Sequence, residues 1–243
     1  MINPMPRRFF AILAGLAVIA TPVMAQSLQD LPFDKQLKLA KVGDIDAQYM
    51  VGRAFETGEN TKRDEAEAAR WFRKSALQGN VDAQYHLARL VATGAKGLKN
   101  DPQTAVKLFQ DAATKGQVEA MNALGQAYQT GNGTAVEPSK AAQWYRKAAD
   151  AKLADAENNL GMLYLRGNGV TRDLGQAFKL FERAAAQNDP WGLNNLGGMY
   201  EMGWGTMIDK PKALDLYKQA LATGNQNARK NIERLSGVSA SAE

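Results

Sequence analysis

A period of 36 residues runs through most of the chain and limits its fold more than any other sequence feature. Each period opens with a small anchor residue; the anchors are Ala47, Ala83, Ala120, Ala156, Gly192 and Ala228. An aliphatic residue lies at position +4 from each anchor, and five units add a small residue at +5, a large residue at +8 and glycine at +11. The anchor, +4 and +8 share one face of an α-helix, and glycine can end a helix with a positive φ. The pattern therefore predicts a helix that stops at each of these glycines.

The second half of each period predicts a second helix. An alanine and then a pair of large residues recur there; the alanines are Ala68, Ala105, Ala141, Ala177 and Ala213. An acidic residue four positions earlier can cap this helix; these residues are Asp64, Asp101, Glu137, Asp173 and Asp209. We expect the small residue at +5 to let a neighbouring backbone come close.

One such helix pair cannot bury its apolar face alone, so the pairs must stack. The predicted fold is all-α: a right-handed α-α superhelical solenoid of about five 36-residue helix-turn-helix repeats, spanning residues 43–225. Half-repeats should cap both ends, as an N-terminal capping helix in residues 26–42 and a C-terminal capping helix in residues 226–235. Residues 236–243 are small and polar and are expected to form a disordered tail.

Residues 1–25 have the three parts of a secretory signal peptide. Arg7 and Arg8 precede an uncharged apolar run from Phe9 to Ala20, and the small residues that a signal peptidase reads end at Ala25. The run is shorter than the roughly 20 residues of a membrane-spanning helix, although an uncleaved anchor is the alternative. The signal looks bacterial, so we expect a periplasmic or secreted protein with no membrane span after cleavage.

Composition excludes several classes of chemistry. The chain has no cysteine and one histidine, so disulfides, thiolate catalysis and Cys- or His-rich metal sites are ruled out. The formal charge is +5, but the basic residues form no long run, so nucleic acid is not an expected partner. Common hydrolase and nucleotide-binding motifs are missing. We therefore predict no catalytic residue, no metal ligand and no cofactor, and a protein that is not an enzyme.

The repeat has the pattern Ala-x3-Leu-Gly-x2-Tyr-x2-Gly-x-Gly, formed best between Ala156 and Val170, with Asp173 and Ala177 following. This pattern resembles the Sel-one-like repeat, a relative of the tetratricopeptide repeat, over roughly residues 43–235. The resemblance implies an adaptor: similar exported bacterial proteins regulate sensor kinases, support envelope polysaccharide systems or contact hosts. Cysteine-rich members are linked to β-lactam binding or hydrolysis, but their cysteines are absent here. The second unit and Gly192 depart from the pattern, and we expect looser packing there.

The inner face of a solenoid is usually lined by the first helix of each pair, which makes positions +2, +3 and +6 the candidate partner-binding positions. With the loop residue Trp204, the candidates are Tyr49, Arg53, Tyr85, His86, Arg89, Asn122, Gln126, Asn158, Met162, Asn194 and Trp204. Arginine and tyrosine often anchor interfaces, and asparagines can bind an extended peptide backbone. Alternatively, Asn159 and Asn195 satisfy loop or helix-end groups of the next unit, Trp204 packs over the C-terminal cap, and His86 is a plain surface residue.

These features predict a periplasmic protein–protein interaction scaffold or regulator. Its concave groove would bind an envelope protein, such as a sensor kinase or polysaccharide machinery. The alternatives are a glycan or peptidoglycan-fragment binding module, and a weak cell-wall or β-lactam hydrolase. A pocket of clustered aromatic and carboxylate side chains would favour the alternatives, whereas a long open groove without a titratable cluster would favour the scaffold.

Overall fold

The computed structural model describes residues 28–237, and each regular element in this range is an α-helix. The five pairs are α3 (Ile45–Thr57) with α4 (Glu65–Leu77), α5 (Val81–Thr93) with α6 (Pro102–Thr114), α7 (Val118–Thr130) with α8 (Pro138–Asp150), α9 (Ala154–Arg166) with α10 (Leu174–Ala186), and α11 (Pro190–Met202) with α12 (Lys210–Ala222). Single helices α2 (Phe33–Lys41) and α13 (Ala228–Ser236) cap the ends. The all-α solenoid with half-repeat caps is confirmed.

Two predictions for the ends of the chain fall outside the described range. The signal peptide of residues 1–25 and the tail beyond residue 237 are not described. The predicted start of the tail is one residue early, because Ser236 is the last residue of α13 and its hydroxyl bonds to the Ile232 carbonyl. Within residues 28–237, the helices are too short and too polar for any of them to cross a membrane.

The repeating glycines and acidic residues set the helix ends as predicted. Each first helix ends at a glycine in the left-handed region, with φ between 64° at Gly94 and 81° at Gly58. Four second helices start at an aspartate that accepts backbone N–H bonds; these are Asp64, Asp101, Asp173 and Asp209. Glu137 differs, because its longer side chain caps no backbone group and binds Lys140 at 2.9 Å instead.

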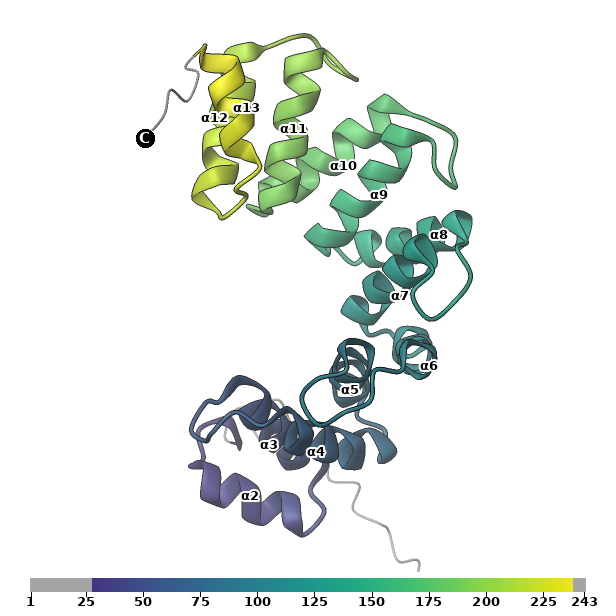
Figure 1. Cartoon of the computed structure of the whole chain (residues 1–243), viewed down its shortest axis with the longest axis vertical. Coiled ribbons are helices and arrows are strands. Elements are labelled where there is room, and N and C mark those ends of the chain that lie inside the picture. Colours follow the sequence, from purple (N-terminus) through teal and green to yellow (C-terminus); the bar gives the residue numbers. More distant parts are fainter. Residues whose placement is uncertain (1–27, 238–243) are drawn as a thin grey trace, which may run out of the picture.

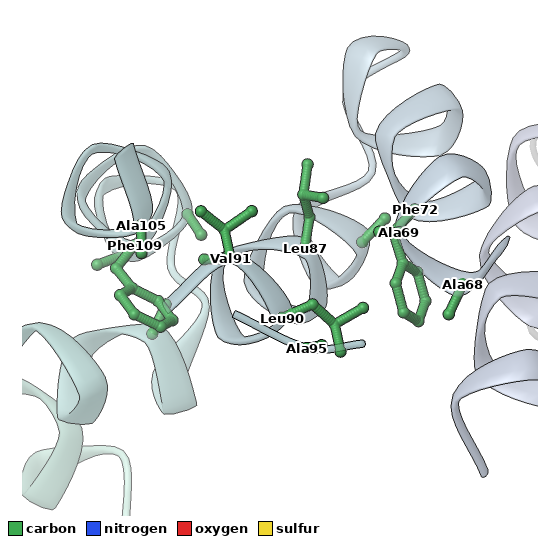
Figure 2. Packing of buried hydrophobic residues seen from close by; sticks show 14 of the residues in the cluster. Ala68, Ala69, Phe72, Leu87, Leu90, Val91, Ala95, Ala105 and Phe109 are labelled. Atoms are coloured by element: carbon green, nitrogen blue, oxygen red, sulfur yellow. The ribbon is translucent and has the colours of Figure 1, made fainter. Parts of the chain in front are cut away.

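The core is a series of clusters between neighbouring helices. Figure 2 shows Leu87, Leu90 and Val91 of α5 between Phe72 of α4 and Phe109 of α6. All five side chains are buried, so α5 packs on its own partner and on the preceding unit at the same time. Each unit therefore depends on both neighbours for its burial, as in other repeat arrays.

The small residue at +5 makes room for an aromatic ring, and not for a backbone as expected. A Cβ on Gly52, Gly125, Gly161 or Gly197 would lie 2.6 to 2.8 Å from a ring of the second helix in the same unit; these rings are Phe72, Tyr145, Phe181 and Tyr217. Glycine therefore fixes the packing distance within a pair.

The looser packing expected at two departures from the repeat is not found. A Cβ on Gly192 would lie 2.6 Å from the Ala184 Cβ, so this glycine brings α11 closer to α10. In the second unit, Ala88 and Val91 are buried in the same cluster as Phe109. Both departures are accommodated by the neighbouring helices.

The helix pairs follow an arc, with α5 and α7 on its inner side and α6 and α8 on its outer side (Figure 1). Glycines in the loops hold successive pairs together. A Cβ on Gly133 would lie 2.2 Å from the Pro102 carbonyl oxygen, and one on Gly169 would lie 2.3 Å from the Pro138 carbonyl carbon. Each proline is the first residue of the second helix in the preceding unit. Backbone therefore meets backbone at these joints.

Candidate partner-binding face

A hollow of about 640 Å³ is lined by the first helices α5, α7 and α9 and by parts of the second helices α6 and α8, and we call it the central groove. Its walls include four of the candidate residues: Tyr85, Arg89, Asn122 and Gln126. Asn159 and the acids Glu119 and Asp155 also line it. Sequence reasoning missed the two acids because they lie in the first turn of a helix, where a carboxylate is favourable without any further role.

Three asparagine pairs connect the first helices of successive units. The residue at +3 donates its amide to the +2 residue of the preceding unit, in the pairs Asn159 to Asn122 (3.0 Å), Asn195 to Asn158 (2.7 Å) and Asn231 to Asn194 (2.9 Å). The alternative that these asparagines satisfy loop or helix-end groups is therefore wrong. Because Asn122 and Asn158 are largely buried, much of their hydrogen-bonding capacity holds the array together.

His86 is buried, with 7% of its surface exposed, so its interpretation as a surface residue was wrong. Its ring stacks on Phe72, with centroids 5.1 Å apart, and contacts Tyr49 and Tyr85. The cause is the geometry seen in the asparagine pairs: a residue at +3 faces the +2 residue of the preceding unit, which here is Tyr49. Helix periodicity alone cannot reveal this contact between units.

Glu56 is the centre of a charged cluster that sequence reasoning also missed. One of its oxygens, Oε2, lies 2.9 Å from His86 Nδ1 and 3.3 Å from Arg53 Nε, while Oε1 lies 3.8 Å from Arg89 Nη1. Burial raises the pKa of Glu56, but His86, Arg89 and Arg53 together bring that pKa below its ordinary value of 4.5. The carboxylate is therefore ionised at neutral pH.

Position +9 has different partners in different units. In the third and fifth units this position accepts a tyrosine hydroxyl at 2.7 Å, from Tyr145 to Gln129 and from Tyr217 to Glu201. The first unit has Phe72 at the equivalent place, which carries no hydroxyl. Glu56 therefore has no tyrosine hydroxyl to accept and binds the histidine and the arginines, whereas Glu201 binds both the Tyr217 hydroxyl and Arg234.

The cluster gives little support to the alternative hydrolase function. Acid–base hydrolysis of a glycan usually needs two carboxylates across an open cleft. The two acids of the central groove, Glu119 and Asp155, lie in first turns of helices, where a carboxylate is favourable without any further role. Glu56 is one carboxylate with 13% of its side chain exposed, held between cations. No set of three His, Asp or Glu side chains that could hold a metal ion forms between residues 28 and 237. The cluster connects α3 to α5 and borders the inner face.

The remaining candidates lie apart from the central groove. Met162 is half-buried against the core of the last two units. Trp204 is 39% exposed in the loop after α11, beside the more exposed Met207 and Ile208. These two residues were missed, although the other loops carry mainly polar residues at the matching places. This loop is a separate apolar patch.

The stacked helix pairs, the capped ends and the open inner groove define an α-solenoid of the class that binds other macromolecules. Five Sel1 repeats match residues 45–80, 81–117, 118–153, 154–189 and 192–225, one for each helix pair. The chain therefore belongs to the Sel1-repeat family, whose members generally mediate protein–protein interactions. No curated protein matches it significantly.

Solved structures support the same fold. A protective antigen present in uropathogenic Escherichia coli strains is 29% identical with a TM-score of 0.76, and the match covers 91% of this chain and 50% of the antigen. This chain thus spans about half the length of that protein. A Sel1 repeat protein from Oxalobacter formigenes is 26% identical with a TM-score of 0.74, covering 83% of this chain and 86% of the other.

Proposed function

We propose that this protein is a periplasmic scaffold or regulator that holds a segment of another envelope protein on the inner face of its solenoid. The central groove is the observation that carries the proposal, because it places Tyr85 and Arg89 of α5 and Asn122 and Gln126 of α7 on one open surface. Large polar and aromatic side chains of this kind are common anchors of protein interfaces. The general role of Sel1 repeats in protein–protein interaction supports it further.

The proposed location rests on residues 1–25. Their charged start, apolar run and small residues are those of an export signal. Fractionation of a Gram-negative host that expresses the whole chain should place the shortened, mature protein in the periplasm. A chain that starts at residue 26 should stay in the cytoplasm. Equal distribution of both forms would refute the proposed location.

A photo-crosslinking amino acid at Gln126 tests the proposed binding face. Gln126 is exposed in the central groove, whereas Gln143 is exposed on α8, an outer helix (Figure 1). Irradiation of cells should give one discrete protein adduct from position 126 and none from position 143, which is the matched control. Equal labelling at both positions, or none at 126, would refute the proposed face. Turnover of muropeptides by the purified protein would refute its non-catalytic role.

A further inference from the structure

The inner face carries an excess of positive charge at α3 and α5. Arg53 and Arg89 both approach the single carboxylate of Glu56. Two cations against one anion leave one positive charge in excess. Across the neighbouring hollow of about 770 Å³, Arg63 and Glu65 form an ion pair at 2.5 Å, so they cancel each other. The excess charge therefore belongs to Arg53 and Arg89.

Arg89 has the larger share of unused binding capacity. Its guanidinium donates no hydrogen bond of normal length within residues 28–237; it lies 3.8 Å from Glu56 Oε1 and 5.8 Å from the centre of the Tyr85 ring. The side chain is 51% exposed. It lines both the central groove and the neighbouring hollow, so a ligand in either can reach it.

Glu56 cannot turn fully toward Arg89, because its other oxygen is close to His86 and Arg53. Three buried polar side-chain atoms in the described chain lack a hydrogen bond of good geometry: Arg53 Nε, Glu56 Oε1 and His86 Nδ1. All three lie in this cluster. These buried atoms face one another, with Glu56 Oε2 2.9 Å from His86 Nδ1 and 3.3 Å from Arg53 Nε, so only the exposed parts of the two guanidinium groups can receive a ligand.

We propose that Arg53 and Arg89 bind a carboxylate of the partner, supplied by an acidic residue of an extended peptide segment. This inference rests on the proposed function and specifies the chemistry of its partner. A guanidinium fork matches a carboxylate in shape and charge, and such charge-assisted bonds are stronger than neutral ones.

The side chains of the groove also indicate which part of the bound segment lies at each end. Asn122, Gln126 and Asn159 supply amide groups that suit a peptide backbone or a neutral side chain. Glu119 and Asp155 line the part formed by α7 and α9 and would repel a second acidic residue. The acidic residue of the partner therefore lies at α3 and α5, and neutral or basic residues run toward α9.

Titration of the mature protein with the peptide Ac-Ala-Glu-Ala-NH2, followed by NMR of the arginine Nε–H groups, tests the carboxylate site. We expect saturable shifts at Arg53 and Arg89 and none with Ac-Ala-Gln-Ala-NH2. R89Q should weaken binding by about tenfold, the loss expected for a charge-assisted hydrogen bond. R73Q is the matched control, because Arg73 is exposed on α4, and it should bind like the wild type. Since Arg89 makes one long ion pair and one distant contact with the Tyr85 ring, R89Q should unfold close to the wild-type temperature.

Three outcomes would overturn the inference: equal shifts with both peptides, no shifts at all, or equal losses for R89Q and R73Q. Tighter binding of trigalacturonate than of the acidic peptide would also overturn it, in favour of an acidic glycan. The crosslink at Gln126 keeps the two proposals separate. If the adduct persists in the double variant R53Q and R89Q, the proposed scaffold function is retained and the proposed carboxylate site is refuted. If the wild type gives no adduct, the proposed scaffold function is refuted, whatever the result of the peptide titration.

Discussion

Two adjacent glycines of α11 allow a sharp test of how the helix pairs are packed. A Cβ on Gly197 would lie 2.8 Å from the Tyr217 ring and 3.3 Å from the Ala213 carbonyl oxygen. A Cβ on Gly198 would meet nothing closer than the Tyr217 hydroxyl at 3.6 Å, an ordinary contact. The substitutions G197A and G198A therefore differ only in the steric surroundings of one added methyl group.

Both substitutions gain about 1 kcal/mol from the higher helix propensity of alanine. G198A should keep that gain. G197A should lose it, because forcing a methyl group into a packed core costs about 1–3 kcal/mol. The propensity gain cancels in the comparison, so G197A should be less stable than G198A by about 1–3 kcal/mol. For a chain of this size, that is a difference of about 2–12 °C in the unfolding temperature.

Thermal unfolding followed by far-ultraviolet circular dichroism measures this difference. Adding Y217L provides a further check, since G197A should cost much less once the ring is gone. If G197A is as stable as G198A, or if its cost is unchanged in the Y217L background, the ring does not set the distance between α11 and α12.

Four further predictions concern single side chains, each measured by thermal unfolding. K152G should stabilise the protein by about 1 kcal/mol, because Lys152 has a φ of 65°, where glycine is unstrained; a loss of stability would contradict this. Burial raises the pKa of Asp189, so the contribution of this residue to the free energy of unfolding declines as the pH rises above 3.8. D189N can still cap α11, and its unfolding temperature at about pH 7 should equal or exceed that of the wild type. The pKa of Glu56 is lowered, so its contribution is present above pH 4.5 and is lost as the pH falls further; the wild type should exceed E56Q at neutral pH and approach it in acid. Y217F should cost about 1.5–3 kcal/mol because the hydroxyl bonds to a carboxylate, whereas Y145F, which loses a bond to a neutral amide, should cost about 0.5–1.5 kcal/mol.

The sequence was sufficient to predict the helix pairs and their ends, because these depend on residues close together in the chain. Glycine at +11 and aspartate at the start of the second helix act within one turn, and Asp101 and Gly131 behave as predicted. The one exception, Glu137, has a side chain one methylene longer than aspartate. Interactions between residues close together in the sequence therefore determine the helix pairs.

The candidate site was predicted less completely, because it depends on contacts between units. Arg89 and Gln126 were chosen by position alone, and both line the central groove. The surroundings of His86 and Glu56 could not be predicted in this way, since His86 packs on Tyr49 and Phe72 of other helices and Glu56 binds His86. A comparison of position +9 with the second-helix ring of the same unit would have identified Glu56 as the acid without a tyrosine hydroxyl to bind.

The contacts of Gly133 and Gly169 with the preceding helix have a consequence for how such a protein diversifies. At these joints main-chain atoms, which every sequence shares, meet directly. Inner-face residues that make no bond between units, such as Gln126, can therefore change while these joints stay the same. Conversely, a bulkier residue at Gly169 would change the angle between two neighbouring units. That change would alter the shape of the groove without any substitution inside it.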